Sequence, residues 1–370
     1  MKIAIDIRST LKKTRTGVGQ YTYNLLKNLF KIDSENEYFL YSKIKLFSKD
    51  KKLPDIRAKN IRYKIDRFNR GLNKTLGKAS VFHTPSQDML DINDTKIVVT
   101  VHDLIFKMYP YGHSKDTIAN AERQILDTIA KADKIICYSK STISDLQRLY
   151  GVPDSKIELV YAGVDRDNFY PMDQPEFQQA KKTVSSFGIN ENFILFVGTI
   201  EPRKNIGNLI LAFNGLKDKN NIPHKLVIIG MKGWMYEEIF KLYNESKYKS
   251  DIVFLDYQPN NVLNNFYNLA EVFVYPSFYE GFGFPILEAF SCGRPVVTSN
   301  VSSCREIGEQ AALLVEPGNS EELSVAILNI LNDSRLKENL QRKGLEKSKL
   351  FSWQEAALKT LKVYKEVAGQ

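Results

Sequence analysis

The sequence predicts two doubly wound α/β domains, each built on a parallel β-sheet. Short, continuously apolar runs rich in β-branched residues recur along the chain, as in strands that are buried on both faces. Amphipathic stretches of helical periodicity lie between these runs, so strand and helix alternate. The length of 370 residues is that of two domains of ordinary size.

The expected elements form two series. In the first half we expect strands at residues 3–7, 38–41, 81–82, 97–101, 135–137 and 159–161. In the second half we expect them at 193–197, 226–229, 252–255, 272–275, 296–297 and 312–315. Helices are expected at 21–30, 115–131, 141–149, 205–216, 321–331 and 352–367. The last helix begins with Ser352 as a cap and has Glu355 three residues later, which is typical of a capping box.

The two series are separated by a segment without apolar periodicity. The stretch GVDRDNFYPMDQPEF, residues 163–177, contains two prolines and is typical of a linker. We therefore expect the domain boundary near residues 169–176.

Composition excludes several classes of protein. The chain is 43% hydrophobic and 26% charged, unlike disordered chains, collagen or small disulfide scaffolds. No window approaches the roughly 18 consecutive apolar residues of a membrane-spanning helix. The first residues, MKIAIDIRST, hold Asp6 and Arg8 within their apolar run and indicate a strand rather than a signal peptide. Cys137, Cys292 and Cys304 have no metal-like or redox-like spacing, which predicts reduced thiols and a cytoplasmic protein.

Positive charge is concentrated in residues 43–79. This segment has thirteen basic and three acidic side chains, a net charge of +10, so the rest of the chain carries −1 of the total of +9. Either an anionic partner or an ordinary solvated face explains such a segment. Apolar side chains interleave with the charges, which favours an anionic membrane surface. They are Phe47, Leu53, Ile56, Ile61, Tyr63, Ile65 and Phe68. No nucleic-acid-binding signature accompanies them, so no nucleic acid is expected as a partner.

Two candidate sites follow strands in the first half, where open parallel sheets bind ligands. In TGVGQY, residues 16–21, Gly17 and Gly19 would let the backbone approach a ligand, although an ordinary loop is the alternative. The spacing is not a dinucleotide fingerprint, because Thr22 stands at the third glycine position. His102 directly follows an expected strand and can donate, accept or carry charge, although a structural histidine is the alternative.

The segment GTIEPRKN, residues 198–205, opens the second series. Arg203 and Lys204 stand just before an expected helix, where cations oppose the helix dipole. They become favourable if an anion binds between them and the helix amides, because both side chains complement phosphate oxygens. We therefore expect a phosphate site here.

The strongest local signal is EGFGFPILE, residues 280–288. Its glycines permit a tight loop, and Pro285 suits the first position of a helix. Glu280 then lies in the loop and Glu288 about one turn into the helix. Carboxylates placed in this way are suited to accepting hydrogen bonds from sugar or ribose hydroxyls.

Together with GVGQY, HDL, GVDRDNFYP and GTIEPRKN, this segment resembles glycosyltransferase family 4, the retaining sugar-nucleotide transferases of GT-B fold. The resemblance extends over residues 1–368, and EGFGFPILEAFSCGRPVVTS, with its two glutamates, is its most specific part. SSCREIGEQAALLVEP and FSWQEAALKTLKVY follow as in that family. The resemblance implies two Rossmann-like domains facing each other across a cleft, with the C-terminal helix crossing back. The acceptor-binding domain would be 1–170 plus 353–370, and the donor-binding domain 171–352.

The resemblance also implies roles for individual residues. Glu280 would contact the donor sugar, Glu288 the nucleotide ribose, and Arg203 and Lys204 the diphosphate. His102 would lie near the transferred sugar, so His102, Glu280, Arg203 and Lys204 are the expected catalytic residues. Further donor-binding positions would be Gly17, Gly19, Gly198, Tyr257, Gly281, Phe282, Gly283, Phe284 and Leu287, with the base beside Gly230 and Tyr257.

The implied activity is transfer of a hexose from a sugar nucleotide to a glycan or lipid-linked hydroxyl, as in cell-surface polysaccharide or lipopolysaccharide biosynthesis. Mannose from GDP-mannose is the first expectation, and UDP-sugars and dTDP-rhamnose are alternatives. No metal or other cofactor is expected, and we interpret the acidic triplet at residues 165–167 as structural. The expected location is the cytoplasm, with peripheral attachment at the inner face of the plasma membrane. Thr199 stands where many relatives carry arginine, which leaves open how Arg203 and Lys204 divide phosphate binding.

Other functions compete with this one. A nucleotide-sugar epimerase shares the GT-B architecture but converts its substrate without an acceptor. A glycoside hydrolase also uses paired carboxylates, but it would not need Arg203 and Lys204. A non-catalytic lipid or nucleic-acid binder would rest on the basic segment alone.

Overall fold

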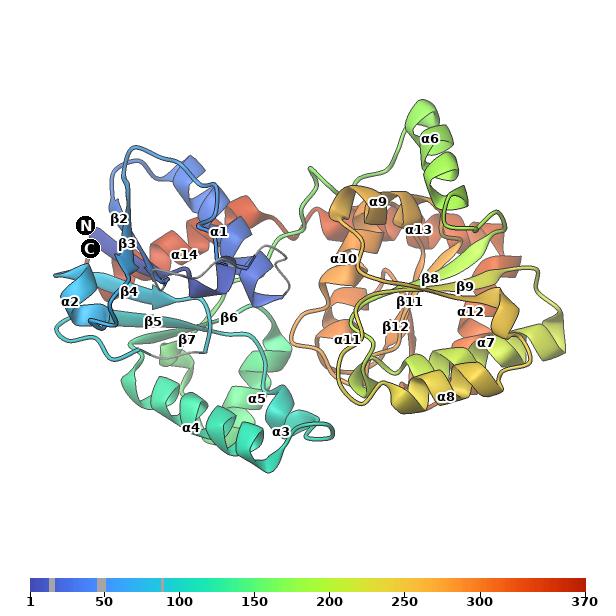
Figure 1. Cartoon of the computed structure of the whole chain (residues 1–370), viewed down its shortest axis with the longest axis horizontal. Coiled ribbons are helices and arrows are strands. Elements are labelled where there is room, and N and C mark those ends of the chain that lie inside the picture. The colour runs from blue at the N-terminus through green and yellow to red at the C-terminus, as the bar shows by residue number, and fades with distance from the viewer. Residues whose placement is uncertain (13–16, 45–50, 88–89) are drawn as a thin grey trace. The chain divides into compact units, whose positions relative to one another are not determined.

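The chain is described by a computed structural model that covers residues 1–12, 17–44, 51–87 and 90–370 (Figure 1). It divides into two compact units. Unit 1 consists of Met1–Phe106, Ser114–Gly163 and Phe351–Gln370, and unit 2 of Lys107–His113 and Val164–Leu350. The chain thus passes from unit 1 to unit 2 after Gly163 and returns after Leu350.

Unit 1 contains a parallel sheet in the order β3-β2-β1-β4-β5-β6-β7 (Figure 1). Its strands are β1 (Lys2–Asp6), β2 (Glu37–Lys43), β3 (Ile61–Asp66), β4 (Val81–Thr84), β5 (Lys96–Val101), β6 (Lys134–Cys137) and β7 (Ile157–Leu159). The helices are η1 (Arg8–Thr10), α1 (Val18–Ile32), α2 (Leu72–Leu76), α4 (Lys115–Lys131), α5 (Lys140–Tyr150), η2 (Asp154–Lys156) and α14 (Trp353–Val367). The short helix α3 (Ile105–Met108) begins in unit 1 and ends in the segment Lys107–His113 of unit 2.

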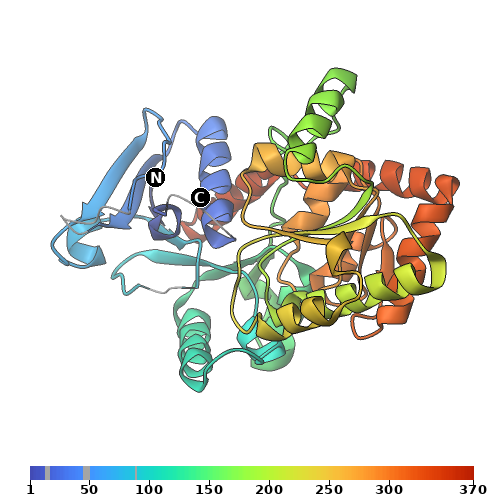
Figure 2. The same cartoon turned by 45° about the vertical axis from the view of Figure 1, so that its right-hand side comes forward.

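Helix α14 comes from the end of the chain and packs against α1 in unit 1 (Figures 1 and 2). The Tyr364 hydroxyl lies 2.6 Å from Nδ1 of His83. A Cβ added at Gly163 would lie 2.1 Å from the Trp353 nitrogen, so the junction needs glycine there. The predicted cap is confirmed, because the Ser352 side chain accepts from the Gln354 and Glu355 amides.

Unit 2 contains a parallel sheet in the order β10-β9-β8-β11-β12-β13. Its strands are β8 (Phe193–Val197), β9 (Lys225–Ile229), β10 (Ile252–Leu255), β11 (Val272–Tyr275), β12 (Val296–Ser299) and β13 (Leu313–Val315). The helices are α6 (Gln174–Ser185), η3 (Pro202–Lys204), α7 (Ile206–Asn220), α8 (Glu237–Glu245), η4 (Lys249–Asp251), α9 (Asn260–Leu269), α10 (Phe284–Ser291), α11 (Ser302–Gly308), α12 (Ser320–Asn332) and α13 (Ser334–Ser348).

The predicted pair of doubly wound parallel sheets is confirmed. Strand β8 illustrates the cause, because all of its residues are buried. Side chains on both faces of such a strand leave water, which stabilises the fold by about 25 cal/mol per Å² of apolar surface. Cys137, Cys292 and Cys304 are buried free thiols, as expected.

Three expectations about local structure were wrong. Residues 61–66 form the edge strand β3, so the alternation of Ile61, Tyr63 and Ile65 with charged residues is that of a strand. Strand β7 ends at Leu159, where we expected it to begin. The end of the expected linker forms the start of α6, because Asp173 and Glu176 build a capping box there.

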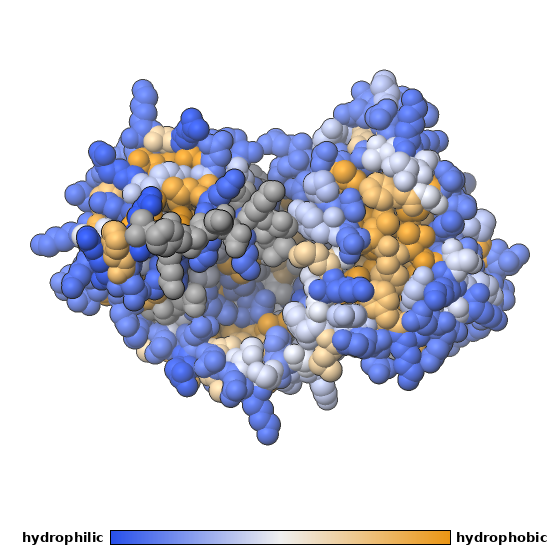
Figure 3. Space-filling view, in the orientation of Figure 1, coloured by the Kyte–Doolittle hydropathy of each residue, from blue (hydrophilic) through white to orange (hydrophobic). Residues whose placement is uncertain are grey.

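The surface seen in Figure 3 is mostly hydrophilic, with an apolar band on unit 2 between α9 and α8. Within the described ranges, no helix combines the length and the apolar character needed to cross a bilayer.

Candidate active site

The candidate site of unit 2 lies where the strand order reverses. The chain runs from β8 outward through β9 to β10 and then returns to β11 on the other side of β8. The loops after β8 and β11 therefore diverge at the carboxyl edge of the sheet, which is where open α/β sheets bind ligands. Arg203 and Lys204 come from the first of these loops and Glu280 from the second.

The structure brings these three side chains into direct contact. Oε1 of Glu280 accepts from Lys204 Nζ at 2.6 Å and lies 2.8 Å from Arg203 Nη1. The Tyr275 hydroxyl lies 3.1 Å from the same oxygen and accepts from Lys204 Nζ at 2.6 Å. None of these contacts uses Oε2 of Glu280. On the opposite side, Arg203 Nη2 donates to the buried carboxylate of Glu201.

The cluster balances two basic against two acidic side chains. Burial alone would raise the pKa of Glu280, but the adjacent Arg203 and Lys204 charges outweigh it and lower the pKa to about 2. Burial raises the pKa of Glu201, and the same two cations oppose that rise. The sequence analysis considered a bound anion as the partner of Arg203 and Lys204, and the structure shows that each also contacts a carboxylate of the chain.

Backbone contacts hold the loops of the cluster together. The Phe278 amide donates to the Arg203 carbonyl at 2.9 Å. Asn205 adopts a left-handed conformation, and its side-chain amide donates to the carbonyl oxygens of Pro276 and Pro317. The Glu280 amide donates to the Ser302 hydroxyl at 3.0 Å. The position of Glu280 is therefore fixed before any ligand binds, as electrostatic catalysis requires.

The glycine loop leads from Glu280 into helix α10. Gly283, with φ +100°, is the residue before the helix, and the rings of Phe282 and Phe284 pack edge to face with their centroids 5.0 Å apart. Pro285 stands in the second helical position rather than the first. Gly281 is buried. The side chain of Leu287 is fully buried too, so Leu287 would offer only its backbone amide to a ligand at this end of the helix.

Glu288 lies one turn into α10 and is half-buried. The Tyr267 hydroxyl donates to its Oε2 at 2.8 Å. Burial raises the pKa of Glu288 to about 7, and the charge of Asp165 adds to the rise while the Tyr267 bond opposes it. The protonation of this carboxyl therefore changes near neutral pH.

The loops after β8 and β9 approach each other closely. A Cβ at Gly230 would lie 1.9 Å from the Gly198 carbonyl oxygen, so this approach requires glycine at position 230. Thr199 packs against Gly233, where a Cβ would lie 2.7 Å from its methyl group. Tyr257 follows the neighbouring strand β10 and is 42% exposed, so its ring is accessible to a ligand.

The other expected residues belong to unit 1. His102 is buried, with Nδ1 2.8 Å from the Tyr138 hydroxyl and Nε2 2.7 Å from the Pro85 carbonyl. Gly17 precedes α1 with φ +44°, and Gly19 is buried in its first turn. Thr16, part of the same expected motif, lies outside the described residues.

Comparison with known proteins identifies the family. Residues 155–347 match the model "Glycosyl transferases group 1", and residues 16–168 match "Glycosyltransferase Family 4". The chain is a group 1 glycosyl transferase. O-antigen chain mannosyltransferase B of Escherichia coli is 33% identical over 270 residues, which are 73% of this transferase and 70% of that protein. Serotype-specific mannosyltransferase WbdA of Escherichia coli is 26% identical over 71% of this chain but only 32% of its own length.

Solved structures show the same GT-B fold. Sucrose-phosphate synthase from Thermosynechococcus elongatus matches with a TM-score of 0.76 at 23% identity, over 99% of this transferase and 98% of that chain. WaaG, a glycosyltransferase involved in lipopolysaccharide biosynthesis, matches with a TM-score of 0.73 at 15% identity over the whole of both chains.

Several residues of the candidate site escaped the sequence analysis. Glu201 and Asn205 stand inside the motif GTIEPRKN. The structure distinguishes them because their polar side chains are buried. Tyr275 ends β11, and Tyr267 lies on α9, 21 residues before its partner Glu288. No sequence pattern distinguishes these two tyrosines from ordinary core residues.

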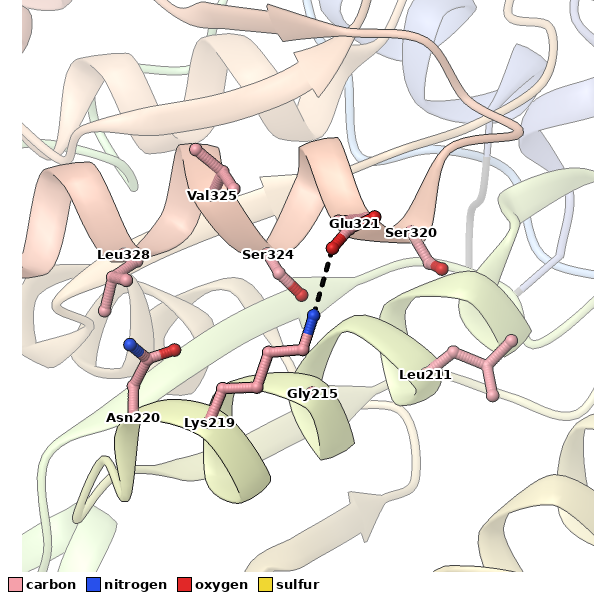
Figure 4. A pocket seen from close by; sticks show the side chains of 9 residues that line it. All are labelled: Leu211, Gly215, Lys219, Asn220, Ser320, Glu321, Ser324, Val325 and Leu328. Carbon is pink, nitrogen blue, oxygen red and sulfur yellow. Dashed lines mark hydrogen bonds and ion pairs between the residues drawn. The ribbon is translucent and has the colours of Figure 1, made fainter.

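A groove elsewhere on unit 2 does not fit a substrate. It lies between α7 and α12 and has a volume of about 190 Å³, below the size of ordinary ligand pockets. Figure 4 shows the Lys219–Glu321 ion pair reaching across it, with both side chains more than 70% exposed.

The acidic triplet at residues 165–167 lies at a turn. Asp165 accepts from the side chain of Asn168 at 2.7 Å, and Arg166 donates to the Ser348 carbonyl. The described part of the chain contains no group of three His, Cys, Asp or Glu side chains that could hold a metal ion.

Proposed function

We propose that this transferase moves mannose from GDP-mannose to a hydroxyl of a glycan or lipid-linked acceptor, with retention of the anomeric configuration and without a metal. The observation that carries the proposal is the buried contact of Arg203, Lys204 and Glu280 at the strand-order reversal of unit 2. The mannosyltransferases among its relatives support mannose as the sugar. We assign the donor to residues 171–352 and the acceptor to residues 1–170 with 353–370.

In the proposed reaction, the bond between C1 of the sugar and the diphosphate oxygen breaks. The bond between C1 and the acceptor oxygen forms on the same face, and the acceptor proton leaves with the diphosphate. Arg203, Lys204 and the first amides of α10 would stabilise the negative charge that develops on the leaving group.

The carboxylates would bind hydroxyl groups. Oε2 of Glu280, which the cation contacts do not use, would accept from the donor sugar. Glu288 would accept from the ribose. Donor binding would also involve Gly17, Gly19, Gly198, Gly281, Phe282, Gly283, Phe284, Leu287 and Tyr257, with His102 close to the sugar.

A donor screen tests this proposal. The protein is incubated with GDP-mannose, UDP-sugars or dTDP-rhamnose and with a dimannoside acceptor, and nucleoside diphosphate release and the new anomeric signal are measured by NMR. We expect release from GDP-mannose and an α-linked product. Conversion of a sugar nucleotide without any acceptor would instead identify an epimerase, and an inverted linkage would refute retention.

We also propose that residues 43–79 attach the transferase to an anionic membrane at its inner face. Lys51, Lys52, Arg57 and Lys59 are exposed, and Phe68 is 63% exposed, whereas residues 45–50, including Phe47, lie outside the described ranges. Reversing the four charges should abolish sedimentation with phosphatidylglycerol vesicles at low salt. Unchanged sedimentation would refute the attachment.

A further inference from the structure

The buried hydroxyl of Tyr267 is directed at a single group. Tyr267 lies on α9, and its side chain is fully buried. Within the described residues, its hydroxyl makes one hydrogen bond, to Oε2 of Glu288 at 2.8 Å. A phenylalanine would fill the same space without burying a polar group, which is unfavourable unless that group is hydrogen-bonded. The hydroxyl therefore acts on the Glu288 carboxyl rather than on the packing of the core.

The direction of this hydrogen bond is fixed by the protonation of both groups. Burial and the Glu288 charge raise the pKa of Tyr267 well above its usual value, so the hydroxyl keeps its proton and donates. Burial raises the pKa of Glu288 to about 7, so this carboxyl is largely ionised at about pH 8. At that pH Tyr267 donates to a carboxylate, a stronger bond than one between neutral groups.

The ring of Tyr267 is held on two sides. Phe169, which follows the junction between the units, packs edge to face on it with centroids 5.6 Å apart. Phe273 of β11 packs against it with centroids 5.3 Å apart. Both phenylalanines are buried, so the ring has little freedom to turn away from Glu288.

Two buried asparagines fix helix α9 itself. Asn264 and Asn268 lie one turn apart on α9. The Tyr170 amide donates to Asn264 Oδ1 at 3.4 Å, and the Met172 amide donates to Asn268 Oδ1 at 3.0 Å. The Cys292 thiol, at the end of α10, donates to Asn264 at 3.2 Å. Because such buried polar networks specify one arrangement, α9 keeps a fixed position beside α10, the helix that carries Glu288.

The contact with Tyr267 leaves one oxygen of Glu288 for a ligand. Glu288 is half-buried, and in the described part of the chain no hydrogen bond or ion pair uses its Oε1. Each carboxylate oxygen can accept two hydrogen bonds, so Oε2 can also accept one more. A ribose offers neighbouring 2′- and 3′-hydroxyls, one for each oxygen. A 2′-deoxyribose offers only the 3′-hydroxyl.

We propose that Tyr267 is a positioning residue that orients Glu288 towards both ribose hydroxyls and makes the nucleotide site selective for ribonucleotides over 2′-deoxyribonucleotides. The inference rests on the proposed function, in which Glu288 accepts from the ribose. It separates the possible donors by their pentose, because GDP- and UDP-sugars carry ribose and dTDP-sugars carry deoxyribose. An analogue that lacks the 2′-hydroxyl leaves an acceptor of the site unpaired, which is a strong basis for rejection.

Isothermal titration calorimetry with GDP and 2′-deoxy-GDP at about pH 8 measures this selectivity as the ratio of the two Kd values. For the unaltered protein we expect GDP to bind about tenfold more tightly or better, the effect of one hydrogen bond to a charged group. Tyr267→Phe should reduce the ratio roughly threefold or more, because the carboxylate is no longer held. Pyrophosphate has no ribose and should bind both proteins with the same Kd.

Two further variants separate positioning from a structural role. The matched control is Tyr248→Phe, which removes a hydroxyl that donates to Asp218 at 2.6 Å, at the end of α8 that precedes β10. It should leave the Kd ratio unchanged. Glu288→Ala removes the group that Tyr267 orients, so adding Tyr267→Phe to Glu288→Ala should not change the ratio further.

An unchanged ratio in Tyr267→Phe would overturn the inference. Equal weakening of GDP, 2′-deoxy-GDP and pyrophosphate would overturn it too, because a general structural defect acts on all three. Either result, in a protein that transfers mannose from GDP-mannose, would leave the proposed function in place. Absence of GDP binding, together with a preference for UDP over 2′-deoxy-UDP that Tyr267→Phe weakens, would refute GDP-mannose as the donor and retain the inference.

Discussion

Replacing Glu280 by glutamine should destabilise unit 2 in a pH-dependent way. The pKa of Glu280 is lowered from 4.5 to about 2, because Arg203 and Lys204 favour the carboxylate more than burial disfavours it. A tenfold change in proton affinity corresponds to about 1.4 kcal/mol, so the ionised carboxyl stabilises the folded state by about 3 kcal/mol at neutral pH. The side chain is only 9% exposed, so solvent screens this interaction little.

The sign of the pH dependence follows from the lowered pKa. The stabilisation is complete above the ordinary pKa of a glutamate and is lost as the pH falls through the lowered value. At about pH 3 the difference between Glu280→Gln and the unaltered protein should fall to roughly half of its neutral value.

Urea unfolding followed by tryptophan fluorescence measures this difference. The chain has two tryptophans, so a Trp353→Phe background leaves Trp234 as the reporter of unit 2. The matched control is Glu321→Gln, which removes an ion pair whose carboxylate is 77% exposed and should cost less than about 1 kcal/mol. A loss below about 1 kcal/mol for Glu280→Gln, or an equal loss at both pH values, would refute the electrostatic argument.

Three further predictions concern the same unit. Lys204→Ala should lower kcat about a hundredfold or more in a donor-turnover assay. The control Lys219→Ala removes an exposed ion pair and should leave kcat unchanged. Equal kcat values for the two variants would contradict the role of Lys204. Because burial raises the pKa of Glu288 to about 7, the folded state loses stability as the pH rises from the ordinary pKa of 4.5 towards that value. Glu288→Gln should therefore stabilise the protein at about pH 8 by roughly 1–3 kcal/mol and by clearly less at about pH 5. Thermal melts at both pH values check this, and a gain of equal size at both would count against it. Gly230→Ala should lower the stability by about 2 kcal/mol or more, while Gly318→Ala, where an added Cβ meets nothing within 4 Å, should be nearly neutral in the same melts.

The parallel strands were predictable because burial on both faces leaves a continuous apolar run, as in β8. The edge strand β3 was not, because its solvent-facing side carries Arg62 and Lys64 and its pattern matches a charged surface segment. Arg203, Lys204 and Glu280 could be named from motifs that follow strands.

The neutralisation of those cations could not be predicted, because Glu201 and Tyr275 reach the cluster only through the tertiary structure. The same holds for Lys107–His113, which belong with unit 2 although their neighbours on both sides belong to unit 1. Tyr109 in that segment stacks on Phe278, a contact between residues 169 positions apart that no local pattern encodes.

The return of the chain to unit 1 after Leu350 sets the order of folding during synthesis. When the ribosome has made residues 1–163, Tyr21 and His83 still lack Trp353 and Tyr364 as neighbours. Residues 164–350 emerge next, and domains generally fold as they are completed. Unit 2 should therefore become resistant to protease on the nascent chain before unit 1. Until residues 351–370 emerge, unit 1 should keep apolar surface exposed and bind chaperones.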